Sequence, residues 1–152
     1  MLPFKLVLIL TLALVAPASA FTFDNIQQGV DLYNSGVESA PGVVKALLGD
    51  ERIQIEITGA NGTVLMAGLE TKNAVIVNAM EGEVEDPTIV LEASEEAVTR
   101  LYQADDPVTA FEEAKKEGEI SIRGTTFTSK LKVSAALAST PALRFFASLM
   151  GK

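Results

Sequence analysis

The chain has 152 residues, of which 12 are basic and 20 acidic, so its formal net charge is −8. This acidic balance argues against a nucleic-acid partner and against an anionic bilayer held by charge alone. Cysteine and histidine are both absent, which excludes disulfides, Ser-His-Asp and Cys-His catalytic sites, and zinc sites of the usual ligand types. We therefore expect no catalytic residues, no metal and no cofactor. A hydrolase built on carboxylates is the remaining enzymatic alternative.

The first twenty residues have the pattern of a signal peptide. Lys5 supplies a positive charge, residues 6–15 are almost entirely apolar, and residues 17–20 end in the small-x-small pattern that signal peptidase prefers. The apolar run is shorter than the ~20 residues needed to span a bilayer; an uncleaved membrane anchor is the alternative. We expect an exported protein (secreted, periplasmic or extracellular) whose mature part is a single domain over residues 21–152.

Two helices are expected to begin the mature chain. Asp24 can cap the first helix, whose apolar face contains Ile26, Val30, Tyr33 and Val37. A second, short helix runs from Pro41 to Gly49, because proline suits the first turn of a helix and glycine its end. Helices of this kind usually cover a sheet.

A β-hairpin follows these helices. Residues 52–58 alternate strictly, so Ile53, Ile55 and Ile57 share one strand face. The dipeptide Asn61-Gly62 predicts a tight turn, since both residues tolerate positive φ, and residues 63–70 return as the partner strand. Residues 61–63 (Asn-Gly-Thr) are also a glycosylation sequon in an exported protein.

The next two segments are an apolar run and an acidic run. Residues 74–77 (Ala-Val-Ile-Val) are apolar at every position, which predicts a central strand buried on both faces. Residues 81–86 contain four acidic side chains. A calcium site is the alternative to a solvated loop there, although the spacing of an EF-hand is missing.

Residues 86–124 predict a strand, two helices and a strand, with a chemical reason at each junction. Residues 88–92 form a β-branched run of strand length. Ser94 and Asp106 are good N-caps, Gly118 ends the second helix, and residues 119–123 alternate again as a strand. The apolar positions expected to face the core are Val98, Leu101, Tyr102, Val108, Phe111, Ile120 and Ile122.

The segment from Thr88 to Gly124, with its ending Gly-Glu-Ile-Ser-Ile-Arg-Gly at residues 118–124, resembles the sterol carrier protein 2 domain. That family has a strand, an acidic-capped helix, a phenylalanine followed by a Gly-x-apolar-x-apolar-x-Gly element, and a C-terminal amphipathic helix. Phe111 precedes the first glycine here by a longer spacer than is usual. The likeness spans roughly residues 24–137, and it implies an apolar ligand, such as a sterol, fatty acid or acyl-CoA, in a tunnel between sheet and helices.

The C-terminal part predicts a helix that begins between Thr126 and Lys130, with an apolar face of Phe127, Leu131, Ala135 and Ala138. An extra strand over residues 125–133 is the alternative. Pro141 breaks or restarts the helix, and residues 143–150 are strongly apolar. This last segment either docks on the core, or lines or lids a lipid cavity or contacts a membrane transiently. If it is a lid, deletion of residues 141–152 should weaken lipid binding and leave the fold intact.

The order of elements predicts an α+β domain with a five-stranded, mostly antiparallel sheet covered on one side by helices. The resemblance adds an expected function, that of an exported lipid-binding or lipid-carrying domain. Its partner is then an apolar small molecule or lipid. The alternative is a secreted protein-interaction module whose cavity is filled by its own side chains. The candidate ligand-lining residues are Leu101, Tyr102, Phe111, Ile120, Ile122, Phe127, Leu131, Phe145 and Phe146.

Overall fold

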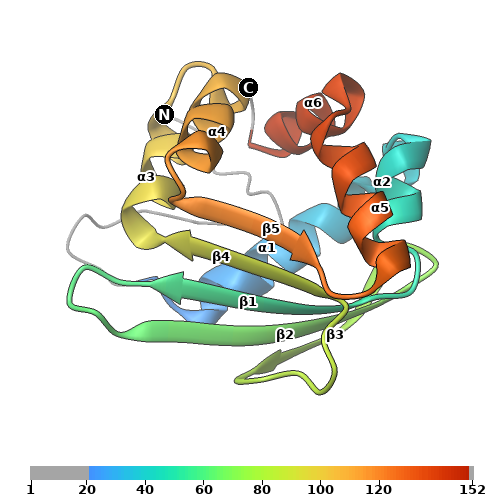
Figure 1. The fold of residues 1–152 in the computed structure, drawn as a ribbon, viewed down its shortest axis with the longest axis horizontal. Helices are drawn as coiled ribbons and strands as arrows, with labels where there is room; N and C mark the ends of the chain where they lie inside the picture. Colours follow the sequence, from blue (N-terminus) through green and yellow to red (C-terminus); the bar gives the residue numbers. More distant parts are fainter. Residues whose placement is uncertain (1–20, 151–152) are drawn as a thin grey trace.

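The computed structural model describes residues 21–150. The signal-peptide interpretation of residues 1–20 therefore concerns residues outside those described. The elements follow one another along the chain (Figure 1) as α1 (Phe23–Gly36), a short 3₁₀ turn η1 (Val37–Ser39), α2 (Gly42–Leu47), β1 (Arg52–Thr58), β2 (Val64–Lys72), β3 (Val75–Glu81), β4 (Ile89–Ser94), α3 (Glu95–Gln103), α4 (Pro107–Lys116), β5 (Ile120–Gly124), α5 (Phe127–Leu137) and α6 (Thr140–Leu149).

The sheet has the strand order β3-β2-β1-β4-β5. Only the β1–β4 pair is parallel; the other three pairs are antiparallel. Ile55 lies opposite Ala67 on one side and Leu91 on the other, and all three side chains are buried in the core beneath the helices. The α+β class and the mostly antiparallel five-stranded sheet are therefore confirmed.

The strand-helix-helix-strand unit forms as predicted, because its junction residues act locally. The Ser94 hydroxyl accepts a hydrogen bond from the Ala97 amide at 3.0 Å, which caps α3. Asp106 caps α4 by accepting from the amide and hydroxyl of Thr109, and these bonds lower the pKa of the Asp106 carboxyl, the hydroxyl contributing most. Gly118 adopts a φ of +79° just after α4, a conformation that glycine tolerates without strain.

The hairpin is confirmed, and its turn is longer than expected. Ile53, Ile55 and Ile57 are all buried on one face of β1. At the turn only Gly62 has a positive φ, +85°, whereas the Asn61 side chain accepts a hydrogen bond from the Thr63 amide at 3.1 Å. The amide of Gly59 donates to the Thr63 carbonyl at 2.8 Å. The residues between β1 and β2 therefore make a five-residue loop instead of a two-residue turn.

The prediction of a central, doubly buried strand at residues 74–77 is wrong. Residues 75–77 belong to β3, which lies at the edge of the sheet and pairs only with β2. Ile76 is buried, but Val75 and Val77 are 38% and 60% exposed. A run of apolar residues does not specify which strands pair with it, so the position in the sheet is not encoded locally. The first helix also begins earlier than expected, with Thr22 and not Asp24 as its N-cap.

The helix at residues 127–137 is confirmed, and the expected strand alternative is not formed. The face predicted to be buried is nevertheless wrong, since Phe127 is 77% and Leu131 57% exposed. The buried residues are Ser129, Val133 and Ala136. A Cβ atom at Gly124 would lie 2.4 Å from the Lys130 amide nitrogen and 2.6 Å from Ser129 Oγ. The start of α5 thus presses against β5 through its small residues, which turns Phe127 and Leu131 outward.

An ion pair fixes α5 to the start of β1. Lys132 Nζ lies 2.6 Å from Glu51 Oε2, and the Glu51 side chain is only 5% exposed. The Glu51 amide also donates to the Thr71 hydroxyl at 2.8 Å, so the carboxylate sits on an ordered segment. Within residues 21–150, no helix combines the length and the apolar character needed to cross a bilayer.

Candidate functional site

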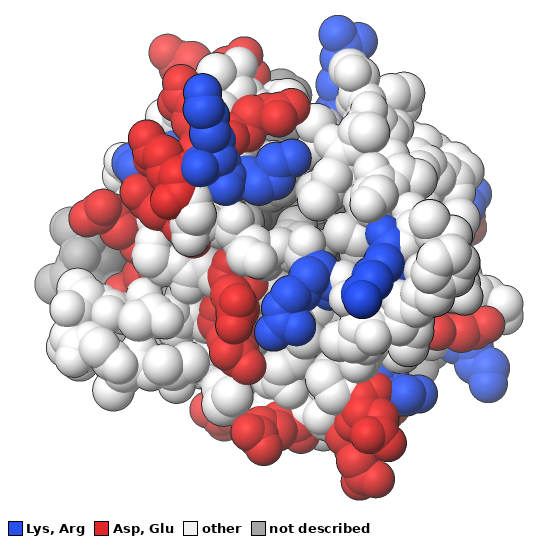
Figure 2. Space-filling model, in the orientation of Figure 1, with Lys and Arg blue, Asp and Glu red and all other residues white. Residues whose placement is uncertain are grey.

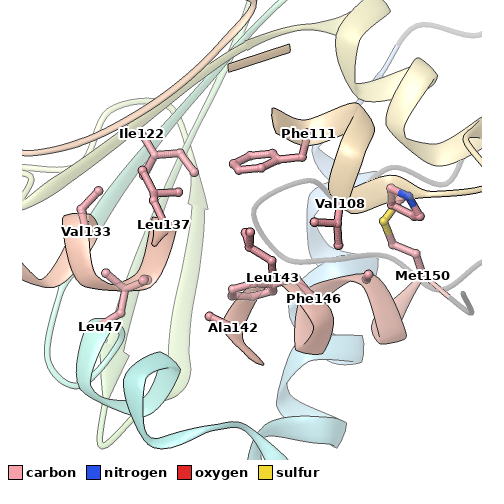
Figure 3. A pocket seen from close by; sticks show the side chains of 13 residues that line it. Leu47, Val108, Phe111, Ile122, Val133, Leu137, Ala142, Leu143, Phe146 and Met150 are labelled. Atoms are coloured by element: carbon pink, nitrogen blue, oxygen red, sulfur yellow. The ribbon is translucent and has the colours of Figure 1, made fainter. Parts of the chain in front are cut away.

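An apolar pocket lies between β5 and the helices α2, α4, α5 and α6. Figure 3 shows side chains from all five elements pointing toward one another around it. The cavity volume is about 50 Å³, and all thirteen lining residues are apolar: Leu47, Pro107, Val108, Phe111, Ile122, Val133, Ala136, Leu137, Ala142, Leu143, Phe146, Ala147 and Met150. The pocket therefore offers apolar contact area and no nucleophile, acid or base.

The sheet side of the pocket follows from strand register. Ile122 pairs with Leu91 in β4, and its side chain shares the inner face of the sheet. α4 reaches the pocket through Val108 and Phe111, which are three residues apart and therefore on one helix face. Pro107 occupies the first turn of α4, where its missing N–H leaves no bond unmade.

α6 closes the opposite side of the pocket. One face of this helix lines the pocket, and another packs against α1. Leu143 and Phe146, one turn apart, point into the pocket (Figure 3). Phe145 points away from it and packs edge-on against Tyr33 of α1, with ring centroids 6.4 Å apart and planes at 85°. The helix is capped by Ser139, which accepts a hydrogen bond from the Ala142 amide at 3.2 Å. Phe145 therefore anchors α6, and Phe146 covers the pocket.

The Tyr33 ring that receives Phe145 is itself held firmly. Tyr33 is completely buried, and its hydroxyl donates to the Ala74 carbonyl at 2.7 Å. Burial raises the pKa of the Tyr33 hydroxyl above its ordinary value. A Cβ atom at Gly36 would lie 3.1 Å from Leu149 Cδ2, so α1 and α6 approach each other closely at this second point as well.

The structure brings together three of the nine candidate lining residues, namely Phe111, Ile122 and Phe146. Leu101, Tyr102 and Ile120 are buried in the core and do not line the pocket. Phe145 packs on Tyr33, and Phe127 and Leu131 face away from the core. A ligand contact for any of the nine stays a prediction.

Ten lining residues were not among the candidates. Val108 lies one turn before Phe111 on the same face of α4, so helical periodicity gave a usable signal for it. Val133 lies on the face of α5 that helical spacing did not predict to be buried. Leu47 and the three alanines, in contrast, become lining residues only because α2, α5 and α6 meet at this point. No local pattern encodes that meeting. Within residues 21–150, no group of three or more acidic side chains is arranged to hold a metal ion.

No protein-family model and no curated protein matches this chain by sequence. Solved structures do match it. The sterol carrier protein domain 2 of Helicoverpa armigera superposes with a TM-score of 0.52 at 15% identity, covering 84% of this chain and 88% of that one. The apo form of sterol carrier protein 2 from Yarrowia lipolytica gives a TM-score of 0.46 at 14% identity, covering 78% of this chain and 98% of that one.

An enzyme is also among the matches. The sec-alkyl sulfatase PisA1 gives a TM-score of 0.45 at 11% identity, with 81% of this chain but only 17% of the sulfatase covered. The Helicoverpa armigera superposition shows that this chain has the fold of the sterol carrier protein 2 domain. The resemblance stated from residues 88–124 is thereby confirmed at the level of the fold.

Proposed function

We propose that this protein binds and carries an apolar ligand of the sterol or fatty-acid class in the space between β5, α4, α5 and α6. The observation that supports this most directly is a pocket with thirteen apolar lining residues in a fold shared with a sterol carrier protein domain. Removal of apolar surface from water stabilises a complex by about 25 cal/mol per Å². Such a site therefore needs no catalytic group.

Binding of a whole lipid requires α6 to move. Pockets that enclose a small molecule usually measure roughly 300–1,000 Å³, whereas this one holds about 50 Å³. α6 is the element suited to opening, because it supplies no strand to the sheet and the two-residue segment Ala138-Ser139 joins it to α5. Outward movement of α6 would carry Leu143 and Phe146 away from Phe111 and Ile122 and enlarge the space between them.

Deletion of residues 141–152 is not a clean test of this lid, and the expectation that it leaves the fold intact needs correction. Ala142, Phe145 and Met150 are each 8% exposed or less and belong to the common core. Their removal would uncover the side chains beneath α6, Tyr33 among them. Point substitutions that fill the pocket avoid this loss.

Ala136→Leu is such a substitution, and Ala135→Leu is its matched control. Ala136 is buried and lines the pocket, while Ala135, the preceding residue of the same helix, is exposed to solvent. We expect Ala136→Leu to weaken the binding of a fluorescent fatty acid at least about tenfold, because three added carbons occupy the space that the ligand needs. Ala135→Leu should bind as the unmodified protein does. Equal affinity in both variants, each shown by circular dichroism to be folded, would place the ligand elsewhere.

Native mass spectrometry and organic extraction of protein purified from its own source test the proposal without choosing a probe. A stoichiometric apolar ligand is the expected result. The alternative function, a secreted protein-interaction module with a filled cavity, is favoured by the small volume and by the two phenylalanines on α6. A folded protein that holds no ligand and takes up neither fatty acids nor sterols would support that alternative. Turnover of ester or glycoside substrates would contradict both.

Export is a further part of the proposal, and it is based on residues 1–20 alone. The intact mass of the protein recovered from its source tests it. We expect a chain that begins at Phe21 and is found outside the cytoplasm. A mass that includes Met1 would contradict cleavage, and recovery of that uncleaved chain with membranes would support the anchor alternative.

A further inference from the structure

Four exposed apolar residues form a stripe along α5 and its C-cap, and we call Phe127, Leu131, Ala135 and Ala138 the outer stripe. Their spacings of four, four and three residues place them on one helix face. Phe127 is 77% exposed and Leu131 57%, which are large fractions for side chains of this size. The opposite face of α5 contributes Val133 and Ala136 to the core and the pocket. Within residues 21–150, the two large side chains of the outer stripe therefore lie mainly in solvent.

The charge of the chain is divided sharply around α5. Residues 120–152 contain five basic and no acidic residues, whereas residues 1–119 contain seven basic and twenty acidic residues. In Figure 2, acidic side chains gather over α3 and α4 and along the lower edge of the view. The region over α2, α5 and α6 at the upper right is mostly uncharged, with separate basic groups. The net charge of −8 thus conceals one cationic and apolar side.

The individual basic groups near the outer stripe differ in how far they are already paired. Lys132 is neutralised by Glu51, and Arg123 lies 4.0 Å from Glu92. Lys130, next to Leu131, and Arg144 of α6 are exposed and form no ion pair with any residue in the range 21–150. These two side chains remain available to a partner with negative charge.

We propose that the outer stripe and Lys130 dock this protein on the surface of an anionic lipid bilayer. Phe127 and Leu131 would enter the boundary between headgroups and acyl chains, where amphipathic surfaces bind, and the basic side chains would lie among lipid phosphates. A stable protein partner buries roughly 800 Å² per side, more than one helical stripe of four residues supplies. A bilayer needs only a few apolar insertions together with local positive charge.

The acidic remainder of the molecule favours this orientation. Charges farther than about 8–10 Å from the bilayer are largely screened at physiological salt, so the acidic side over α3 and α4 contributes little once α5 is in contact. If the acidic side itself came within this distance of an anionic bilayer, repulsion would turn it away. The net negative charge of the chain argues only against a bilayer contact held by charge alone. The outer stripe adds an apolar contribution to that contact. Docking would also place the pocket one helix thickness from the bilayer, on the other face of α5.

Flotation of the mature protein (residues 21–152) with lipid vesicles tests the proposal. The vesicles are pure phosphatidylcholine or phosphatidylcholine with about one third phosphatidylglycerol, an anionic lipid. We expect binding to the anionic vesicles, at least about tenfold weaker binding to the neutral ones, and a steep loss with added salt. The affinity for anionic vesicles should fall about tenfold or more in the variant Phe127→Ser/Leu131→Ser and a few-fold in Lys130→Glu. Val77→Ser is the matched control, because Val77 is 60% exposed at the far edge of the sheet.

Three results would overturn the proposal: no flotation of the unmodified protein with anionic vesicles, unchanged flotation of the Phe127→Ser/Leu131→Ser variant, or an equal loss in Val77→Ser. The first would favour a protein partner for the outer stripe. Docking does not depend on the proposed function, since flotation measures no ligand. Ala136→Leu, which fills the pocket, should still float as the unmodified protein does. The two proposals can therefore fail separately.

Discussion

Replacing Phe145 by alanine should detach α6 from the core at its main anchor. The ring is 8% exposed and packs edge-on against Tyr33 at 6.4 Å. Truncation of a buried phenylalanine to alanine costs about 3–5 kcal/mol, which includes the aromatic contact. α6 lies outside the hydrogen-bonded sheet and can relax around the lost ring, so we expect a destabilisation of about 3 kcal/mol, at the lower end of this range. Phe127→Ala removes the same atoms from a 77% exposed site and should cost less than about 0.5 kcal/mol.

Urea denaturation followed by far-ultraviolet circular dichroism measures both free energies of unfolding. A loss of about 3 kcal/mol is a large part of a typical domain stability of roughly 5–15 kcal/mol, so Phe145→Leu, which costs about 1 kcal/mol, provides a milder variant. Since each 1.4 kcal/mol changes an equilibrium about tenfold, opening of α6 in Phe145→Ala should rise by about two orders of magnitude, and stopped-flow fatty-acid uptake should accelerate. Equal stabilities for Phe145→Ala and Phe127→Ala would refute the packing described for α6.

Three further outcomes are expected. Burial raises the pKa of Tyr33 above its ordinary value and that of Tyr102 to about 12, so tyrosinate absorbance should rise only well above pH ~10. The stability linked to these raised pKa values is present below pH ~10 and lost as the pH increases. Tyr33→Phe should reduce that loss. Tyrosine titration near pH ~10 in the folded protein would contradict the burial of both hydroxyls. Gly124→Ala should lower the free energy of unfolding, measured by urea denaturation, by about 2 kcal/mol or more, because the added Cβ would lie 2.4 Å from the α5 backbone. Gly42→Ala, with open space around it, should be nearly neutral. Similar urea midpoints for the two variants would show that β5 and α5 are not so close. Lys132→Met should lower the free energy of unfolding by about 2 kcal/mol, because it leaves the buried Glu51 carboxylate without its partner. An unchanged melting temperature would contradict a stabilising role for this ion pair.

The parts of the fold that were predictable from sequence are those encoded within a few residues. Ser94, Asp106 and Gly118 act on neighbours three residues away or on their own φ angle, so the strand-helix-helix-strand unit could be read directly. The alternating isoleucines of β1 gave the correct buried face. In each case a short-range pattern and the final packing agree.

The predictions were wrong where packing between segments far apart in the sequence determines which residues are buried. Val77 is apolar and lies on an edge strand, a position set by pairing with β2 alone. On α5, helical spacing correctly identified Phe127 and Leu131 as sharing one face, but the close approach of Gly124 to Ser129 turned that face to solvent. Ser129 is buried in its place, since its hydroxyl accepts from the Thr126 amide at 2.9 Å and so satisfies its polarity locally.

The candidate site was predictable only in part for the same reason. Phe111, Ile122 and Phe146 are large apolar residues that any core prediction would include, and they do line the pocket. Large residues such as Leu101 are equally apolar and lie in the filled core. The difference is where α4, α5 and α6 leave space between them, and that depends on how three helices meet.

The most direct test of the central proposal is an isotope-filtered nuclear Overhauser measurement. It would use palmitate, a long-chain fatty acid, as the probe and protein labelled at its methyl groups. We expect contacts from the acyl chain to methyl groups of Val108, Val133 and Leu143, which line the pocket from three different helices. Contacts confined to exposed methyl groups such as those of Val64 and Val77, or none at all with excess palmitate and folded protein, would contradict the account.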